Sequence, residues 1–317
     1  MRKENRYFVF DRPKALSLKN IVKLILWYIE GPIYKTILQI YHPSHQKRRY
    51  DVSICAIFKD EGKYLKEWIE YHRIVGVQHF YLYNNFSSDN YQEILQPYID
   101  REIVTLKDWP IKQGQMQAYK DCVEQFGHEA QWIGFIDIDE FIVPNKTNTV
   151  GEFLKKFINR PIVIIYWRYF GSSGLMHRKE NGLVTEDFIV ASEKYGNIGK
   201  LFYNTDYDYA DDLPKNQYMH VRWGRYKGIA LPPVNLFDNV CLYDEHYAPS
   251  DEFPIQINHY LIKSYDEYAK KRIRGGGVHK DFHNEEYLWR HEYLCAGVDY
   301  HIYRFLLRLK LAMGIKE

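Results

Sequence analysis

Short apolar segments alternate with amphipathic ones between residues 51 and 138, and this alternation predicts the fold of the first half of the chain. Four segments have the composition of buried strands, at residues 52–58, 80–83, 104–106 and 132–138. Three segments between them carry apolar residues at helical spacing, at residues 63–75, 89–96 and 115–126. Strands alternating with helices of this length predict an α/β fold with a mostly parallel sheet flanked by helices.

The second half of the chain has a less regular pattern, in which strand-like segments are rich in aromatic residues. These segments occupy residues 161–170, 183–190, 200–203, 218–223 and 257–260. Residues 206–214 are acidic and loop-like, whereas residues 265–274 form a basic segment that predicts a helix. Gly275–Gly277 follows it, and three consecutive glycines predict a flexible hinge.

The first 50 residues lack the strand–helix alternation and contain amphipathic segments followed by a basic linker. Residues 18–41 predict two amphipathic helical pieces separated by Gly31–Pro32, because proline interrupts a helix interior. Their longest uninterrupted apolar run, Leu24–Ile29, is far too short to span a membrane. The two pieces either pack on the following domain as a helical hairpin, or lie in the plane of a membrane or against a partner.

These differences divide the chain into a helical extension at residues 1–50, a domain at residues 51–299 and a C-terminal amphipathic helix at residues 300–317. Both ends combine an apolar face with basic residues, so we expect peripheral contact with an anionic membrane surface. The alternative is that both ends pack on the domain or make an oligomer contact. The short apolar run near the N-terminus does not resemble a signal peptide, so we expect a cytoplasmic protein.

Composition narrows the range of functions. The 317-residue chain has a net charge of only +2, so bulk charge gives no support to nucleic-acid binding. Its 29 tyrosines and seven tryptophans are a weak indication of carbohydrate binding, because aromatic rings stack on sugars as well as filling cores. Its four cysteines are widely spaced and form no CxxC motif, so we expect reduced, packed thiols.

Three acidic residues interrupt the apolar segment Trp132–Pro144. If this segment is a strand, Asp137 and Asp139 lie at positions i and i+2 and point to the same face. Two carboxylates on one face repel each other, and burying them unpaired is costly. A divalent cation such as Mg²⁺ or Mn²⁺ removes that cost and keeps open positions for substrate phosphates. The alternative is that the acids end a strand and face water.

Polar residues also follow the other strands of the predicted sheet. Asp60 and Glu61 follow the first strand, and Asn84 comes directly after the second. Because ligands of parallel α/β sheets bind at the carboxyl ends of the strands, these residues predict a binding site beside the two aspartates. No GxGxxG or GxxxxGKS/T motif follows the first strand, which argues against a dinucleotide oxidoreductase and a P-loop NTPase. Asp60 and Glu61 also suit a helix N-terminus, where negative charge is favourable.

Several short motifs occur one after another along the chain, in an order typical of a known family. They are Cys55–Glu61, Leu65–His72, Gly76–Phe80, Tyr83–Asp89, Asp137–Phe141, Phe170–Gly174, Asn258–Ser264 and Lys271–Gly275. Together they resemble glycosyltransferase family 92, a family with a GT-A fold, and the resemblance runs from about residue 51 to residue 275. Two positions depart from the family, since Asp60 stands where it usually has Asn and Leu261 where it has Trp.

The resemblance implies a GT-A-like, Rossmann-type sheet and a metal-dependent, inverting transfer of sugar from a nucleotide-sugar donor. A Mn²⁺ or Mg²⁺ ion on Asp137 and Asp139 would stabilise the negative charge that grows on the leaving diphosphate. His259 is implied as a third protein ligand, and the alternative is a buried strand histidine bonded to the backbone. Donor-binding residues are expected to include Asp60, Glu61, Asn84, Asp89, Gln115, Lys263, Lys271 and Arg274.

An inverting reaction also needs a carboxylate base near the acceptor hydroxyl. Glu186 is the first candidate, and Asp187 and Asp211 are alternatives. We expect a UDP-sugar donor and a glycan or lipid-linked acceptor, in the synthesis of a surface polysaccharide, with no nucleic-acid partner. One alternative is a nucleotidyltransferase, which also uses paired aspartates but would ordinarily carry a Gly-rich phosphate loop. Another is an inactive carbohydrate-binding or scaffold protein.

Overall fold

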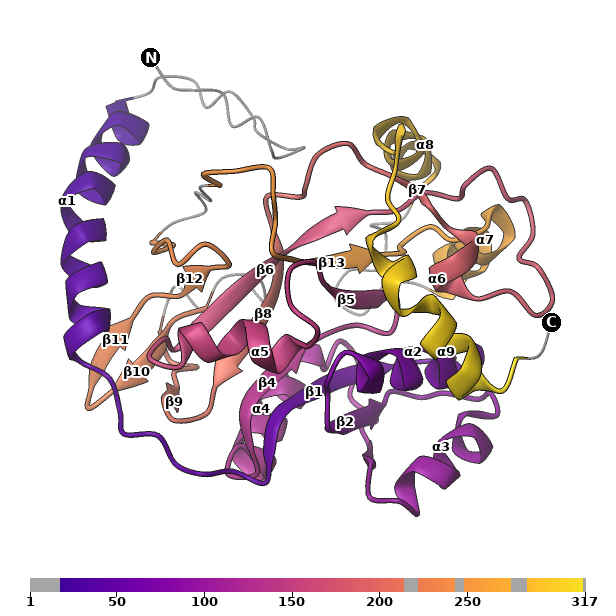
Figure 1. Ribbon diagram of the computed structural model, residues 1–317, viewed down its shortest axis with the longest axis horizontal. Coiled ribbons are helices and arrows are strands. Elements are labelled where there is room, and N and C mark those ends of the chain that lie inside the picture. Colours follow the sequence, from indigo (N-terminus) through magenta and orange to yellow (C-terminus); the bar gives the residue numbers. More distant parts are fainter. Residues whose placement is uncertain (1–17, 214–221, 243–247, 275–283, 316–317) are drawn as a thin grey trace.

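The protein is organised around a nine-stranded sheet in the computed structural model, which describes residues 18–213, 222–242, 248–274 and 284–315 (Figure 1). The first half of the chain contributes four parallel strands and the helices that connect them. These elements are β1 (Tyr50–Phe58), α2 (Gly62–Ile74), β2 (His79–Asn84), α3 (Tyr91–Ile99), β3 (Val104–Asp108), α4 (Gln115–Phe126) and β4 (Ala130–Phe135). The predicted alternation of strands and helices is confirmed.

The second half of the chain completes the sheet. Its strands are β5 (Glu140–Pro144), β6 (Ile162–Tyr169), β8 (Gly199–Asn204), β12 (Val234–Asn235) and β13 (Ile255–His259). The order is β3-β2-β1-β4-β8-β6-β13-β5, with β12 paired to β6, and β8 and β5 run antiparallel to their neighbours. All residues of β2, β5, β8 and β13 are buried, so both faces of the sheet are covered. The expected α/β fold with a mostly parallel sheet is confirmed.

Smaller elements surround the sheet. They are the strands β7 (Val190–Ala191), β9 (Asp208–Tyr209), β10 (Gly224–Tyr226), β11 (Ile229–Leu231) and β14 (Gly297–Val298), and the helices α5 (Val150–Leu154), α6 (Val184–Asp187), α7 (Tyr265–Arg274) and α8 (Glu285–Leu294). The strands form two sheets, β11-β10-β9 and β14-β7. Helix α7 agrees with the helix expected at residues 265–274, and all four cysteines are buried free thiols, as expected.

One predicted strand ends earlier than expected, and another is wrong. The strand expected at residues 132–138 ends at Phe135, because the chain turns before β5 begins. The segment 183–190 contains the helical turn α6, because the N–H groups of Val184 and Thr185 donate to the buried Glu67 carboxylate instead of to a strand. Most of the strand expected at residues 218–223 lies outside the described residues, which resume at residue 222. The hinge expected at Gly275–Gly277 also lies outside them.

Helix α1 (Leu18–Ile40) is continuous through Pro32, so the predicted break at Gly31–Pro32 is wrong, and with it the hairpin alternative. Pro32 is exposed, so its missing N–H group removes a helix hydrogen bond at a surface that water reaches. The C-terminal part of the helix is attached to the protein, since Leu38 is buried and the ring of Tyr34 packs edge-on against Trp223 at 5.3 Å.

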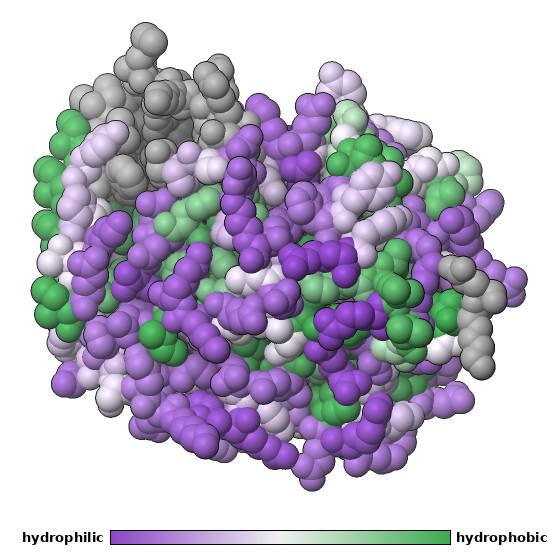
Figure 2. Space-filling view, viewed as in Figure 1, coloured by the Kyte–Doolittle hydropathy of each residue, from purple (hydrophilic) through white to green (hydrophobic). Residues whose placement is uncertain are grey.

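The rest of α1 presents an exposed apolar face, visible as the green column at the left edge of Figure 2. Its exposed apolar residues are Val22, Ile25, Leu26, Tyr28, Ile29, Ile33 and Ile40. Within the described part of the chain, none of the helices combines the length and the apolar character that crossing a membrane requires.

The predicted C-terminal helix is present as a 3-10 helix at His301–Phe305 followed by α9 (Leu306–Met313). It packs on α2 and buries Leu309. Leu307 and Leu311, four residues apart, remain exposed on its outer side. The structure therefore supports packing of this end on the domain, with a short apolar stripe left uncovered.

Candidate active site

The turn between β4 and β5 places Asp137 and Asp139 at the carboxyl end of β4. The indole N–H of Trp68, on α2, donates to the carbonyl oxygens of Asp137 at 3.1 Å and Glu140 at 2.8 Å. The Glu140 carboxylate accepts from the N–H of Asp137, and the carbonyl of Asp139 accepts from the N–H of Tyr260. These bonds satisfy the backbone of the turn and fix the points from which both aspartate side chains extend.

Asp139 faces His259 and Lys271. His259 reaches it because β13 pairs with β5 in a register that sets His259 opposite Glu140. Asp139 Oδ1 lies 3.8 Å from His259 Nε2, and Asp139 Oδ2 accepts from Lys271 Nζ at 2.5 Å. Burial alone would raise the pKa of Asp139, but the Lys271 ammonium beside it holds that pKa well below its usual range. Burial lowers the pKa of His259 to about 3, so its imidazole is neutral, the form that ligates metals.

Asp137 has different partners. Its Oδ2 atom lies 2.6 Å from Lys200 Nζ, on β8, and its Oδ1 atom accepts from Gln115 Nε2 at 3.0 Å. The hydroxyl of Tyr119 also donates to Oδ1, at 3.3 Å. Asp137 and Asp139 are therefore paired with different lysines. The prediction that they share one face of a strand is wrong, because both lie in a turn.

Lys200 is a site residue that sequence analysis missed. Its side chain is only 1% exposed, and Nζ also lies 3.5 Å from Glu140 Oε2. Burial lowers the pKa of this lysine by itself, but Asp137 and Glu140 outweigh that effect and raise it, so the lysine is charged. The sequence feature that could have identified it is a lysine in the predicted strand segment Lys200–Tyr203. A lysine in a buried strand needs a carboxylate partner, so it would have indicated a nearby acid.

Asp139 and His259 fit the chemistry of a divalent cation site. A carboxylate oxygen and a neutral imidazole nitrogen are suitable ligands, and two atoms 3.8 Å apart can share one ion at bond lengths of about 2.0–2.2 Å. Glu140 Oε1 is buried and has no hydrogen-bond partner among the residues that the structure describes, and it lies 4.0 Å from the same nitrogen. Among the residues that the structure describes, no group of three or more His, Cys, Asp or Glu is arranged to hold a metal ion. Water and substrate phosphates would supply the remaining ligands.

Three of the expected donor-binding residues connect the loops that follow β1 and β2. Asp60 Oδ1 accepts from the N–H of Ser88 at 2.7 Å, and Asp89 Oδ2 accepts from the N–H of Gly62 at 2.6 Å. Asn84 Nδ2 donates to Asp108 and to Tyr91, each at 2.9 Å. These bonds hold the two loops together at the carboxyl edge of the sheet.

The expected basic residues lie partly beside Asp139. Lys263 is buried, and its Nζ atom stands 3.9 Å from the centroid of the Tyr64 ring. Burial lowers the pKa of Lys263, while the neighbouring Glu61 and Asp139 act in the opposite direction. Arg274 ends α7, and its side chain lies outside the described residues.

Each candidate base is held in an ion pair away from these contacts. Glu186 Oε1 lies 2.7 Å from the Lys310 ammonium, and Asp187 Oδ1 lies 2.7 Å from that of Lys179. Asp211 pairs with Arg222 at 2.6 Å and with Lys120 at 3.5 Å. In the described structure none of the three carboxylates contacts Asp137, Asp139 or His259, so the base stays a prediction.

Comparison with known sequences identifies relatives of this chain. The sequence profile of glycosyltransferase family 92 matches residues 48–222. A glycosyltransferase family 92 protein of Ricinus communis is 25% identical over 254 residues, which cover 76% of this chain and 41% of that protein. The β-1,4-galactosyltransferase galt-1 of Caenorhabditis elegans is 28% identical over 168 residues, covering 48% of this chain and 40% of that protein. The chain spans less than half the length of these curated relatives.

Solved structures also match the chain. The structure of S. aureus TarS 1–349 is 12% identical, with a TM-score of 0.38, covering 84% of this chain and 75% of that chain. A complex of the same TarS fragment with UDP matches at 13% identity with a TM-score of 0.33, covering 49% of this chain and 47% of that chain.

Proposed function

Because this chain belongs to glycosyltransferase family 92, we propose that it transfers a sugar from a nucleotide-sugar donor to a glycan or lipid-linked acceptor. The proposal includes a divalent metal, Mn²⁺ or Mg²⁺, held by Asp139 and His259. The observation that carries it is the 3.8 Å approach of Asp139 Oδ1 to His259 Nε2 at the carboxyl edge of the sheet. This edge is where open α/β sheets bind their ligands.

The proposed roles follow from the charges at this edge. The bound metal would neutralise the charge that develops on the leaving diphosphate. Lys271, 18% exposed, and the buried Lys263 supply cationic groups beside Asp139 for the same phosphates. Asp137 keeps 32% of its side chain exposed, and Lys200 and Gln115 hold it in place to accept a hydrogen bond from the donor.

The donor sugar and the stereochemistry are finer parts of the proposal. Curated relatives bear the name β-1,4-galactosyltransferase, among them galt-1 and the galactan β-1,4-galactosyltransferase GALS2 of Arabidopsis thaliana, so UDP-galactose is the first donor to test.

An inverting transfer needs a carboxylate base. Glu186, Asp187 and Asp211 remain the candidates for this base, and each is held in an ion pair. A role in surface polysaccharide synthesis completes the proposal.

A panel of UDP-sugars tests this function by the release of UDP, with and without an acceptor glycan. We expect release from one donor in the presence of Mn²⁺ and its loss when EDTA removes the metal. A nucleotidyltransferase would instead consume a nucleoside triphosphate and release pyrophosphate. A binding or scaffold protein would bind a glycan and turn over none of the donors. Either of these two results would refute the proposal.

We also propose that α1 contacts a membrane surface peripherally. Its apolar residues Ile25, Tyr28, Ile29 and Ile33 are all more than half exposed, and apolar helix faces of this kind insert at the acyl boundary. Flotation with anionic liposomes at low salt is the measurement. The unmodified protein is expected to float, and a variant carrying Ile25→Glu with Ile29→Glu is expected to stay at the bottom. Sedimentation of the unmodified protein would contradict the proposal and favour a packing role for this helix.

A further inference from the structure

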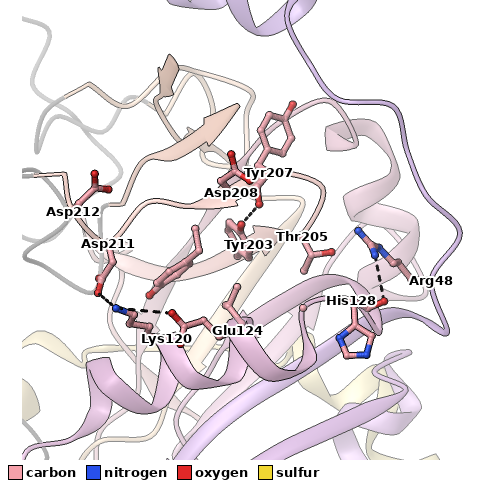
Figure 3. A pocket seen from close by; sticks show the side chains of 13 residues that line it. Arg48, Lys120, Glu124, His128, Tyr203, Thr205, Tyr207, Asp208, Asp211 and Asp212 are labelled. Atoms are coloured by element: carbon pink, nitrogen blue, oxygen red, sulfur yellow. Dashed lines mark hydrogen bonds and ion pairs between the residues drawn. The ribbon is translucent and has the colours of Figure 1, made fainter. Parts of the chain in front are cut away.

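A cavity of about 670 Å³ lies between the C-terminal half of α4 and the strands β8 and β9 (Figure 3). The buried rings of Tyr203 and Tyr207 form part of its wall, and charged side chains stand around them. The charged and polar lining residues are Arg48, Lys120, Glu124, His128, Thr205, Asp208, Asp211 and Asp212. Sequence analysis singled out only Asp211 among these residues, and the proposed donor site uses none of the others.

Contacts between aromatic rings connect the cavity to Asp137. Tyr209, which lines the cavity, packs on Phe135 with the ring centroids 6.5 Å apart. Phe135 stacks on Tyr119 at 4.5 Å, and the Tyr119 hydroxyl reaches Asp137. Strand register gives the scale, because Tyr203 lies opposite Ile133, four residues before Asp137. At about 3.3 Å per residue, this corresponds to roughly 13 Å along the strand. The lining extends farther from Asp137, since Thr205 bonds to Gln131, six residues before Asp137.

The ion pairs of the lining leave its two cations poorly placed to bind an anionic ligand such as the donor diphosphate. The lining contains the carboxylates of Glu124, Asp208, Asp211 and Asp212 and the cations Arg48 and Lys120. Two further cations, Arg222 and Arg225, pair with Asp211 and Asp212. Of the lining cations, Arg48 pairs with Asp206 at 3.2 Å and Lys120 with Asp211 at 3.5 Å. Both lining cations are therefore already neutralised, and the cavity suits an uncharged ligand better than a phosphate.

Asp208 and Glu124 are the lining acids whose carboxylates make no hydrogen bond with the part of the protein that the structure describes. Asp212 is held by Arg225 through two bonds of 2.8 Å, and Glu124 lies 3.9 Å from Lys120. The side chain of Asp208 makes no hydrogen bond or ion pair with the part of the protein that the structure describes, and it is exposed. A carboxylate without a partner at the rim of a cavity is suited to accept hydrogen bonds from hydroxyl groups.

We propose that this cavity is a remote acceptor subsite for a neutral glycan chain. An uncharged polyhydroxylated ligand gives hydroxyl donors to Asp208 and Glu124, and the half-buried ring of Tyr209 can contact its apolar faces. The volume falls in the range of ligand pockets, about 300–1,000 Å³. The distance to Asp137 is one that a short oligosaccharide bridges and a monosaccharide does not. The inference rests on the proposed function, since it assigns the substrate class that the second site of that reaction recognises.

Acceptor length is the variable that tests the subsite. The probes are β-1,4-linked galacto-oligosaccharides from the disaccharide to the hexasaccharide, with the donor found active. In the unmodified protein we expect KM for the acceptor to fall about tenfold along the series, the effect of one or two hydrogen bonds to a charged group. Asp208→Asn and Glu124→Gln, both near-isosteric changes at exposed positions, should remove most of this decrease. KM for the disaccharide, KM for the donor and kcat should stay unchanged.

Asp100→Asn is the matched control, because Asp100 is an exposed acid on the loop after α3 and lies outside the cavity. It should retain the full dependence on acceptor length. Saturation-transfer NMR with the hexasaccharide alone supplies a second readout, in which Asp208→Asn weakens binding without any donor present. A wild-type KM that does not depend on length, or a dependence that both cavity variants retain, overturns the subsite. Loss of donor turnover in every protein would instead count against the proposed function.

Discussion

Asparagine in place of Asp139 is expected to abolish Mn²⁺-dependent binding of UDP. The substitution removes the charge of the oxygen that faces His259 at 3.8 Å, and an amide oxygen is a much poorer partner for a divalent cation. We expect the affinity for Mn²⁺ to fall by more than about 100-fold. Removing a residue that only hydrogen-bonds to a metal ligand lowers metal affinity roughly 10–100-fold, and Asp139 is proposed to be a ligand itself. Isothermal titration with Mn²⁺, with and without UDP, measures the effect.

Asp137→Asn is the informative comparison for this variant. Because Lys200 and Gln115 hold Asp137 on the other side of the turn, we expect its loss to weaken UDP binding more than Mn²⁺ binding. Thermal unfolding of both variants serves as the folding control, since the backbone bonds of the turn do not depend on either carboxylate. Undiminished Mn²⁺ affinity in Asp139→Asn would refute the metal site, and equal losses in both variants would refute the division of roles.

The first half of the fold was predictable from the sequence because its signals are local. Each strand from β1 to β4 is a short apolar run, and each helix between them repeats at helical spacing. The pattern of apolar residues could not show that β4 ends at Phe135. The apolar residues Ile136 and Ile138 are buried in the turn as they would be in a strand, so hydrophobicity alone extended the strand through both aspartates.

The second half of the fold depends on pairings between distant residues, which a local pattern does not contain. His259 reaches Asp139 through the pairing of β13 with β5, two strands more than 100 residues apart in the chain. The motif around His259 suggested this contact, whereas Lys200 belongs to none of the quoted motifs and was missed. The strand predicted around Glu186 was wrong for a similar reason. The Glu67 carboxylate that binds the backbone of α6 belongs to another helix, α2, far away in the sequence.

Methionine in place of Lys271 is expected to change the affinities for metal and nucleotide in opposite directions. Lys271 Nζ binds Asp139 Oδ2 at 2.5 Å and so lies beside the proposed metal. At a separation of roughly 5 Å, an ammonium and a divalent cation repel each other by several kcal/mol at an effective dielectric constant near 20. Solvent reaches this side chain and reduces the effect, so we expect Mn²⁺ to bind about tenfold more tightly without UDP. UDP should bind about tenfold more weakly, because its diphosphate loses a charge-assisted hydrogen bond.

Lys270→Met provides the matched control on the same helix. Lys270 is 75% exposed and lies 3.9 Å from Asp266, one turn earlier on α7. Its loss removes the same formal charge from α7 without touching Asp139, so both affinities should change by less than about twofold, as for a surface ion pair. Titration of each variant with Mn²⁺ alone, and then with UDP at saturating Mn²⁺, separates the two effects. If Lys271→Met weakened Mn²⁺ binding as well, the lysine would serve to orient Asp139 Oδ1 toward the metal instead of competing with it. If it behaved like Lys270→Met, the contact with Asp139 would have no part in binding either ligand.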